Sequence, residues 1–345
     1  MTSLRNFIIT RIILLIPMIW LLVTIVFLLL RVLPGDPITT ISPQLPAHQA
    51  EAIREQLGLN RPLIEQYFDF LFRILSFDFG NSIRSGEAVA IEVQLAYGPT
   101  VMLGLFGVLL GVPLGVVLGG LAGAKRERTI DHAIRIATIA TYALPIFLLG
   151  ILFQFIFAVQ TGITWDLFGI GLPPVDLVHA GGTAEFTHFT EIWILDALLS
   201  GRPDIAFEIF LHLILPGTCL GLLIGSTIAR QVRTHMIYQL EQDYVQFSRA
   251  RGIPETDLLY KDVLKNSAIP SIGLIGLQIA LVLAGAVLTE TTFNIPGLGR
   301  YLFNAIADRD FPSIQASVVL FAIIVSVISL LTDVIYSILD PRIRY

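Results

Sequence analysis

The side chains best suited to catalysis or metal binding are few in this 345-residue chain, and their spacing matches none of the common site motifs. The single cysteine, Cys219, lies within an apolar segment, so an intrachain disulfide is impossible and a metal cluster is disfavoured. The sequence has no Gly-x-x-x-x-Gly-Lys-Ser/Thr phosphate loop and no Gly-x-Ser-x-Gly nucleophile turn. Six histidines occur without a His-Glu-x-x-His pattern: His48, His132, His179, His188, His212 and His235. These absences disfavour an enzyme, and we expect no metal and no cofactor bound to this chain.

Three isolated polar or kink-forming residues invite a sharper hypothesis. Glu290 stands near the end of an apolar segment, where a carboxylate suggests a function. The alternative is that Glu290 lies at the membrane interface, paired or solvated, and holds the following loop in place. Pro145 could be a hinge or a static kink. We therefore predict Pro145 and Glu290 as candidate gating or translocation-path residues. His212 follows Glu208 by one helical turn, which predicts a local contact rather than a ligand.

The composition is that of a membrane protein. Hydrophobic residues make up 54% of the chain and charged residues only 14%, with a mean hydropathy of +0.77. About 20 apolar residues cross the hydrocarbon core as a helix, and six segments qualify: roughly 12–30, 99–121, 134–159, 207–229, 272–293 and 314–339. The expected fold class is therefore all-α, a polytopic membrane protein with six transmembrane helices. Pro113, Gly115 and Gly119 within them predict kinks or close packing.

Basic residues predict the orientation of these segments, because Lys and Arg accumulate on the cytoplasmic side. Fourteen of the 22 basic residues lie before the first segment, after the second, after the fourth or after the sixth, and five more lie in the long 31–96 stretch. This distribution places both termini in the cytoplasm. The first segment lacks a small-residue cleavage site, so we expect it to be retained rather than removed as a signal peptide.

The two segments expected outside the cell differ in character. Residues 31–96 include apolar residues at helical spacing from Leu63 to Leu75, which predicts a small helical cap near the membrane surface. Residues 160–206 are rich in Gly, Pro and acidic side chains, and Trp165 and Trp193 are predicted interface anchors.

The largest polar stretch between apolar segments runs from Tyr244 to Pro270. Gly252 ends one helical pattern and Pro254 opens the next, with Glu255 and Asp257 in its first turn. The sequence thus predicts a short helix pair held at the cytoplasmic surface, with a face exposed to a soluble partner.

This stretch resembles the cytoplasmic coupling loop, or EAA loop, of ABC importer permeases. Ser248-Arg-Ala-Arg-Gly252, with Pro270 eighteen positions after the glycine, is similar to the version in the dipeptide/oligopeptide/nickel family. The loop of the wider family begins Glu-Ala-Ala, where this chain has Gln246-Phe-Ser248. The resemblance continues in five further motifs: Gly58-Leu-Asn-Arg-Pro62, Phe79-Gly-Asn-Ser82, His212-Leu-Ile-Leu-Pro216, Glu290-Thr-Thr-Phe-Asn-Ile-Pro-Gly-Leu-Gly-Arg300 and Arg309-Asp-Phe-Pro312.

The resemblance implies a type I importer permease, the first of two homologous permeases, in the cell membrane. Residues 1–96 would form an outer helix and an extracytoplasmic segment, and 97–341 a five-helix core with the coupling loop at 244–270. The implied partners are the second permease, two ATPases that bind ATP and Mg, an extracytoplasmic solute-binding protein and the lipid bilayer, without nucleic acid. The residues implied to couple to an ATPase are Arg249, Ala250, Arg251, Gly252, Ile253, Glu255, Asp257 and Leu258.

Substrate identity stays open between dipeptides, oligopeptides, nickel chelates and oligosaccharides, and family frequency favours peptides. A secondary transporter or channel is the rival class. Such carriers often hold ionisable pairs near the membrane midplane, whereas the segments here are nearly free of charge. The rival is therefore disfavoured.

Overall fold

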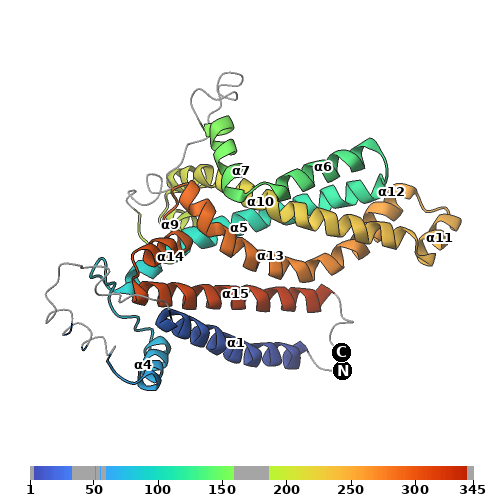
Figure 1. Ribbon diagram of the computed structural model, residues 1–345. Coiled ribbons are helices and arrows are strands. Elements are labelled where there is room, and N and C mark those ends of the chain that lie inside the picture. The colour runs from blue at the N-terminus through green and yellow to red at the C-terminus, as the bar shows by residue number, and fades with distance from the viewer. Residues whose placement is uncertain (1–3, 33–50, 52–54, 56–59, 159–185, 340–345) are drawn as a thin grey trace.

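The computed structural model describes residues 4–32, 51, 55, 60–158 and 186–339, which are mainly helical and contain no β-strand (Figure 1). Long helices run side by side, with α4, α9 and α14 near one end and α11 and α12 at the other (Figure 1). In chain order the elements are α1 (Leu4–Val32), α4 (Leu63–Leu75), α5 (Val89–Ala124), α6 (Thr129–Ala143), α7 (Ile146–Phe153), the π-helical turn η1 (Gln154–Ala158), α9 (Trp193–Leu199), α10 (Pro203–Leu240), α11 (Asp243–Ala250), α12 (Glu255–Asp257), the π-helical turn η3 (Leu258–Val263), α13 (Leu264–Thr292), α14 (Leu298–Ala307) and α15 (Phe311–Leu339).

Four described helices are long and apolar enough to cross a membrane: α1, α5, α10 and α15. The pair α6 and α7 adds a fifth segment if a bent pair counts as one span. These five cover the expected segments 12–30, 99–121, 134–159, 207–229 and 314–339. The remaining expected segment, 272–293, falls almost wholly within α13, where most side chains between 272 and 285 lie outside the described residues.

The helices α5 and α10 pack backbone against backbone through glycines. On α5, glycine recurs at every fourth position from Gly107 to Gly119, which places these residues along one face of the helix. A Cβ added to Gly111 would lie 2.5 Å from the carbonyl oxygen of Gly221, and one added to Gly115 would lie 2.7 Å from that of Gly225. Since lipid tails are as apolar as the side chains, helices in a membrane associate mainly through such close packing. The expected close approach at Gly115 and Gly119 is confirmed.

The expected span 134–159 is broken rather than straight. The axes of α6 and of the segment Ile146–Phe157 differ by 107°. Leu144 is extended, at φ −76° and ψ 131°, and Pro145 caps the start of α7. The residue before a proline disfavours the α conformation, and proline has no N–H to continue the helical ladder. The chain therefore turns sharply at this pair.

The helix α1 packs at the periphery against α15 (Figure 1). An ion pair of 3.1 Å joins Arg11 on α1 to Asp333 on α15. Because α1 runs toward the α4 end and α15 runs back, the first residues of α1 and the last of α15 lie at the end that carries α11 and α12 (Figure 1).

The expectation of Trp193 as an interface anchor is wrong. Trp193 begins α9, is buried, and belongs to the main hydrophobic core together with Leu103 and Ile209. Burial of the aromatic ring between helices removes more apolar surface from water than a half-exposed position at the membrane interface would, and is therefore more stabilising. Trp165, the other predicted anchor, lies outside the described residues.

We expect Gly111→Ala to destabilise the fold, because its methyl group would overlap the backbone of Gly221. Overpacking of this kind costs about 1–3 kcal/mol, which would lower the midpoint of thermal unfolding followed by tryptophan fluorescence in detergent. Gly104→Ala is the matched control, since a Cβ on Gly104 has no neighbour within 4 Å. Equal midpoints for the two variants would contradict this account of the α5–α10 contact.

Candidate coupling site

The turn after α11 is held by a Schellman motif. The N–H of Ile253 donates to the carbonyl of Ser248 at 3.2 Å, and the N–H of Gly252 donates to that of Arg249 at 2.9 Å. This pattern requires a left-handed residue just after the helix, and Gly252 has φ +74°. The predicted helix end at Gly252 is confirmed. Its space is open, with no atom within 4 Å of an added Cβ, so the requirement for glycine is conformational rather than steric.

A double hydrogen bond joins the two sides of this turn. The guanidinium of Arg249 donates from Nη2 to Oε1 of Glu255 at 2.7 Å and from Nε to Oε2 at 3.2 Å. These bonds, made to the charged carboxylate, hold the pKa of Glu255 below its ordinary value and that of Arg249 above its own. Both side chains are about half exposed, so the pair contributes orientation of α11 against α12 more than stability.

The eight residues implied for coupling do not share one environment. Arg249, Ala250, Arg251, Gly252 and Glu255 are exposed, while Ile253 and Asp257 are half-buried. Leu258 is fully buried in the main core. A partner can therefore touch the turn itself, whereas Leu258 fixes the turn to the helices beneath it.

One exposed aromatic residue of this surface was missed in the sequence. Phe247 on α11 is 64% exposed, and the guanidinium carbon of Arg251 lies 5.8 Å from the centre of its ring. Exposed aromatic side chains next to arginine are typical of the centres of protein interfaces. A sequence signal could have identified Phe247: it is the middle residue of Gln246-Phe-Ser248, where this chain departs from Glu-Ala-Ala.

The second helix of the predicted pair is not a separate short helix. From α12 the chain passes through η3 directly into α13, so one continuous helical path runs from Glu255 to Thr292. A π-helical turn keeps the backbone helical while it shifts the side-chain register. At the start of α13, Leu264 fits against Gly120 of α5, where an added Cβ would lie 2.8 Å from its Cδ1. The turn at Gly252 is thus directly connected to a helix of the core.

A buried ion pair beside this element was also missed. Asp131, at the start of α6, is 0% exposed and accepts two hydrogen bonds from Arg233 of α10, at 2.6 and 2.8 Å. It also accepts the backbone N–H of Glu127 at 3.0 Å. Such a fully hydrogen-bonded pair locks the α5–α6 turn to α10, because removing either partner would leave a buried charge uncompensated.

At the opposite end of α13, Glu290 is fully buried. Its Oε1 accepts the hydroxyl of Thr100 at 2.6 Å, and its Oε2 accepts the backbone N–H of Arg300 at 2.8 Å. The Thr100 hydroxyl in turn accepts the N–H of Leu298 at 2.7 Å. Gly297 approaches the carboxyl group so closely that a Cβ there would collide with it. The Glu290 carboxyl group therefore holds the following loop in place through hydrogen bonds and is shielded from solvent.

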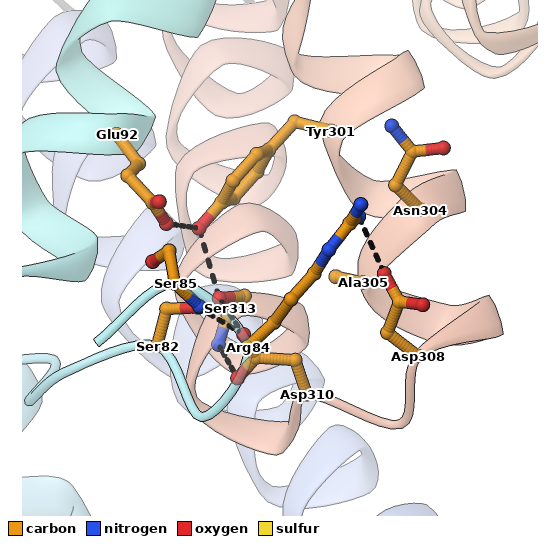
Figure 2. A pocket seen from close by; sticks show the side chains of 10 residues that line it. All are labelled: Ser82, Arg84, Ser85, Glu92, Tyr301, Asn304, Ala305, Asp308, Asp310 and Ser313. Carbon is orange, nitrogen blue, oxygen red and sulfur yellow. Dashed lines mark hydrogen bonds and ion pairs between the residues drawn. The ribbon is translucent and has the colours of Figure 1, made fainter. Parts of the chain in front are cut away.

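A second polar network joins α5, α14 and α15 at the same end of the bundle (Figure 2). The Tyr301 hydroxyl is within hydrogen-bond distance of Glu92 at 2.7 Å and of Ser313 at 2.8 Å. Asp310 accepts the hydroxyls of Ser82 at 2.5 Å and of Ser313 at 2.8 Å. Burial raises the pKa of the Tyr301 phenol, so it stays protonated. These groups line a cavity of about 250 Å³, across whose mouth Arg84 reaches Asp308 (Figure 2).

The other candidate residues are accounted for locally. Pro145 lies at the break between α6 and α7, which leaves its role as hinge or static kink a prediction. His212 Nδ1 lies 2.9 Å from the carbonyl oxygen of Glu208, the local contact expected. Among the described residues no group of three His, Cys, Asp or Glu side chains could hold a metal ion.

We expect Thr100→Val to destabilise the chain by about 1–3 kcal/mol, because it leaves the Glu290 carboxylate and the Leu298 N–H without their shared partner. Thr100→Ser keeps the hydroxyl and is the matched control. The midpoint of thermal unfolding in detergent checks both variants. A Thr100→Val protein as stable as Thr100→Ser would show that this hydrogen bond does not hold the loop.

Comparison with known proteins gives matches over almost the whole chain. Residues 111–345 match the family described as binding-protein-dependent transport system inner membrane component, and residues 4–90 match its N-terminal model. The chain is 34% identical over 337 residues to the dipeptide transport system permease protein of Alkalihalophilus pseudofirmus, covering 97% of this chain and 98% of that one. It is 33% identical over 343 residues to the di/tripeptide transport system permease protein of Pseudomonas aeruginosa, covering 99% of each. It is 31% identical over 341 residues to the glutathione transport system permease protein of Escherichia coli, again covering 99% of each. The chain belongs to the family of binding-protein-dependent transport system inner membrane components.

Proposed function

We propose that this chain is one permease subunit of an ATP-driven importer of di- or oligopeptides. The observation that carries the proposal is the Gly252 turn: an exposed, conformationally specified turn that continues without interruption into a helix of the core. Such an element can receive a force from a soluble partner and pass it to the helices. The rival, a carrier driven by ion gradients, has no need of it.

Six transmembrane helices with both termini in the cytoplasm are the arrangement we propose. The six proposed spans are the five apolar segments described above and α13, which is 29 residues long. In its support, the first residues of α1 and the last of α15 lie at the α11–α12 end (Figure 1). Arg233, Arg249 and Arg251 lie at that same end, and basic residues favour the cytoplasmic side.

The proposed division of labour is the one that the resemblance to type I importer permeases implies. Residues 97–341 form the core, residues 1–96 an outer helix with an extracytoplasmic segment, and 244–270 the coupling loop of a type I importer. Two separate ATPases bind ATP and Mg, a homologous second permease completes the path, and a solute-binding protein delivers substrate outside. In this scheme the chain moves substrate but carries out no covalent chemistry.

Peptides are the proposed substrate because of the relatives' names. The matched proteins are described as permeases for dipeptides, di/tripeptides, D,D-dipeptides and glutathione, all of them short peptides or a peptide-like molecule. Free amino and carboxylate termini are common to these compounds. Uptake of radiolabelled dipeptide and of glutathione by proteoliposomes that hold the assembled complex would test the substrate class, and uptake of neither would refute it.

Gly252→Val should abolish uptake and the ATP hydrolysis that the binding protein stimulates. A β-branched residue at φ +74° costs about 1–2 kcal/mol, which would tilt α12 away from α11. Gly252→Asn is the matched control, because asparagine tolerates the left-handed region, and it should retain most of the activity. Substrate affinity of the isolated binding protein should be equal throughout. A Gly252→Val complex that assembles and transports at the wild-type rate refutes the coupling role.

Reversal of the Arg249–Glu255 pair gives an independent test. Arg249→Glu alone puts two carboxylates at the turn, and we expect ATP hydrolysis to become at least several-fold less responsive to the binding protein. Arg249→Glu combined with Glu255→Arg should recover the response if the pair only orients α11 on α12. Failure of the double variant, with the complex intact, would instead assign Arg249 to direct contact with the ATPase.

A further inference from the structure

The helix α4 has three distinct sides. One side, with Tyr67 and Phe70, faces α1; a second carries the exposed charges Glu65, Asp69 and Arg73. The third side, between them, is apolar. Because side chains three and four positions apart share a helix face, its members gather into one stripe: Ile64, Phe68, Phe72 and Leu75.

The first side makes side-chain contacts with α1. The ring of Phe27 on α1 stacks on Phe70 at 5.4 Å and meets Tyr67 edge-on at 5.3 Å. The Tyr67 hydroxyl lies 2.7 Å from that of Thr24, also on α1. This contact fixes how α4 is rotated about its axis, and with it the direction of the apolar stripe.

The apolar stripe has no cover within the described part of the chain. Its four side chains are between 52% and 76% exposed. Burying one large apolar side chain is worth about 1.5–3 kcal/mol, so a stripe of four facing water would be strongly unfavourable. An occupant must therefore cover it.

The position of the contact on α1 sets the depth of α4. Thr24 and Phe27 precede Arg31, the first charged residue after the apolar run of α1, by seven and four positions. With a rise of 1.5 Å per residue, these contacts lie about 10 and 6 Å before Arg31 along α1. The helix α4 thus packs beside the last apolar turns of α1 rather than beyond them. Ile25, Leu28 and Leu29 of the same turns are themselves exposed, so α1 still presents an apolar surface at the depth where α4 packs.

We infer that α4 is an interfacial helix whose stripe of Ile64, Phe68, Phe72 and Leu75 lies in the outer leaflet of the bilayer, at the boundary between acyl chains and headgroups. An amphipathic helix in this position buries its apolar face about 5–10 Å deep and keeps its charges toward water. Figure 1 shows α4 at the end of α1, on the side away from α5 and α10. The lipid contact anchors the outer end of α1 and is independent of which substrate is carried.

Fluorescence quenching in nanodiscs tests this placement on the full chain. Single cysteines replace Phe72 on the stripe, Arg73 on the charged side and Ile16 within the α1 span, each in a Cys219→Ser background and labelled with bimane. Quenchers are a lipid with a nitroxide high on its acyl chain, a lipid with a deep nitroxide, and aqueous iodide. We expect the shallow nitroxide to quench Phe72→Cys at least twofold more than Arg73→Cys, with iodide showing the opposite order and Ile16→Cys responding most to the deep nitroxide.

Two results would overturn the inference. Equal iodide quenching at positions 72 and 73 would place the stripe in water. Protection of position 72 from every quencher would show that a protein surface covers it, either another copy of this chain or a partner. If Phe72→Cys does not accumulate, Phe72→Trp with brominated lipids supplies the same comparison against Arg73→Trp, in a background whose three native tryptophans are replaced by phenylalanine. The same two outcomes decide.

Discussion

The glycine-mediated contact between α5 and α10 is the constraint on which the other elements depend. In a bilayer no hydrophobic effect drives helices together, so close backbone packing must supply the attraction. Gly111 and Gly115 meet Gly221 and Gly225 with no room for a methyl group. The resulting pair is the rigid body against which the remaining core helices are arranged, and α10 carries α11 directly at its end.

Against this body, α13 is attached near both ends by different means. At the α11 end Leu264 fits over Gly120, and the Arg249–Glu255 pair holds the preceding turn. At the other end, the carboxylate of Glu290 is bound through Thr100 to α5. The first attachment combines an exposed ion pair, which is cheap to break, with Leu258, which is buried in the main core. The second is a buried, fully hydrogen-bonded carboxylate, which is expensive to break.

The features that could be predicted from the sequence are those that local residue patterns determine. Composition predicts five of the apolar segments. Helical periodicity predicts the helix at Leu63–Leu75, and a glycine between two helical patterns predicts the left-handed turn at Gly252. The pairs Asp131–Arg233 and Thr100–Glu290 join residues 102 and 190 positions apart, and no local pattern identifies such partners. The same holds for the burial of Trp193, which depends on where α9 meets α10. The bend at Pro145 is an intermediate case: proline predicts a kink, but its angle of 107° is set by packing.

The dense packing that stabilises this chain also limits where substrate can pass. Between α5 and α10 there is no room for a Cβ atom, so nothing the size of a peptide can cross along that contact. Two buried acidic groups, Glu290 and Asp131, are hydrogen-bonded to their own chain. The cavity at Tyr301 is confined to the end that carries α14. In the described part of the chain, this packing favours a path along an outer face of the bundle, where lipid would block a polar solute unless a second protein surface encloses the path. The packing within this one chain is thus a physical reason for the homologous second permease that we propose.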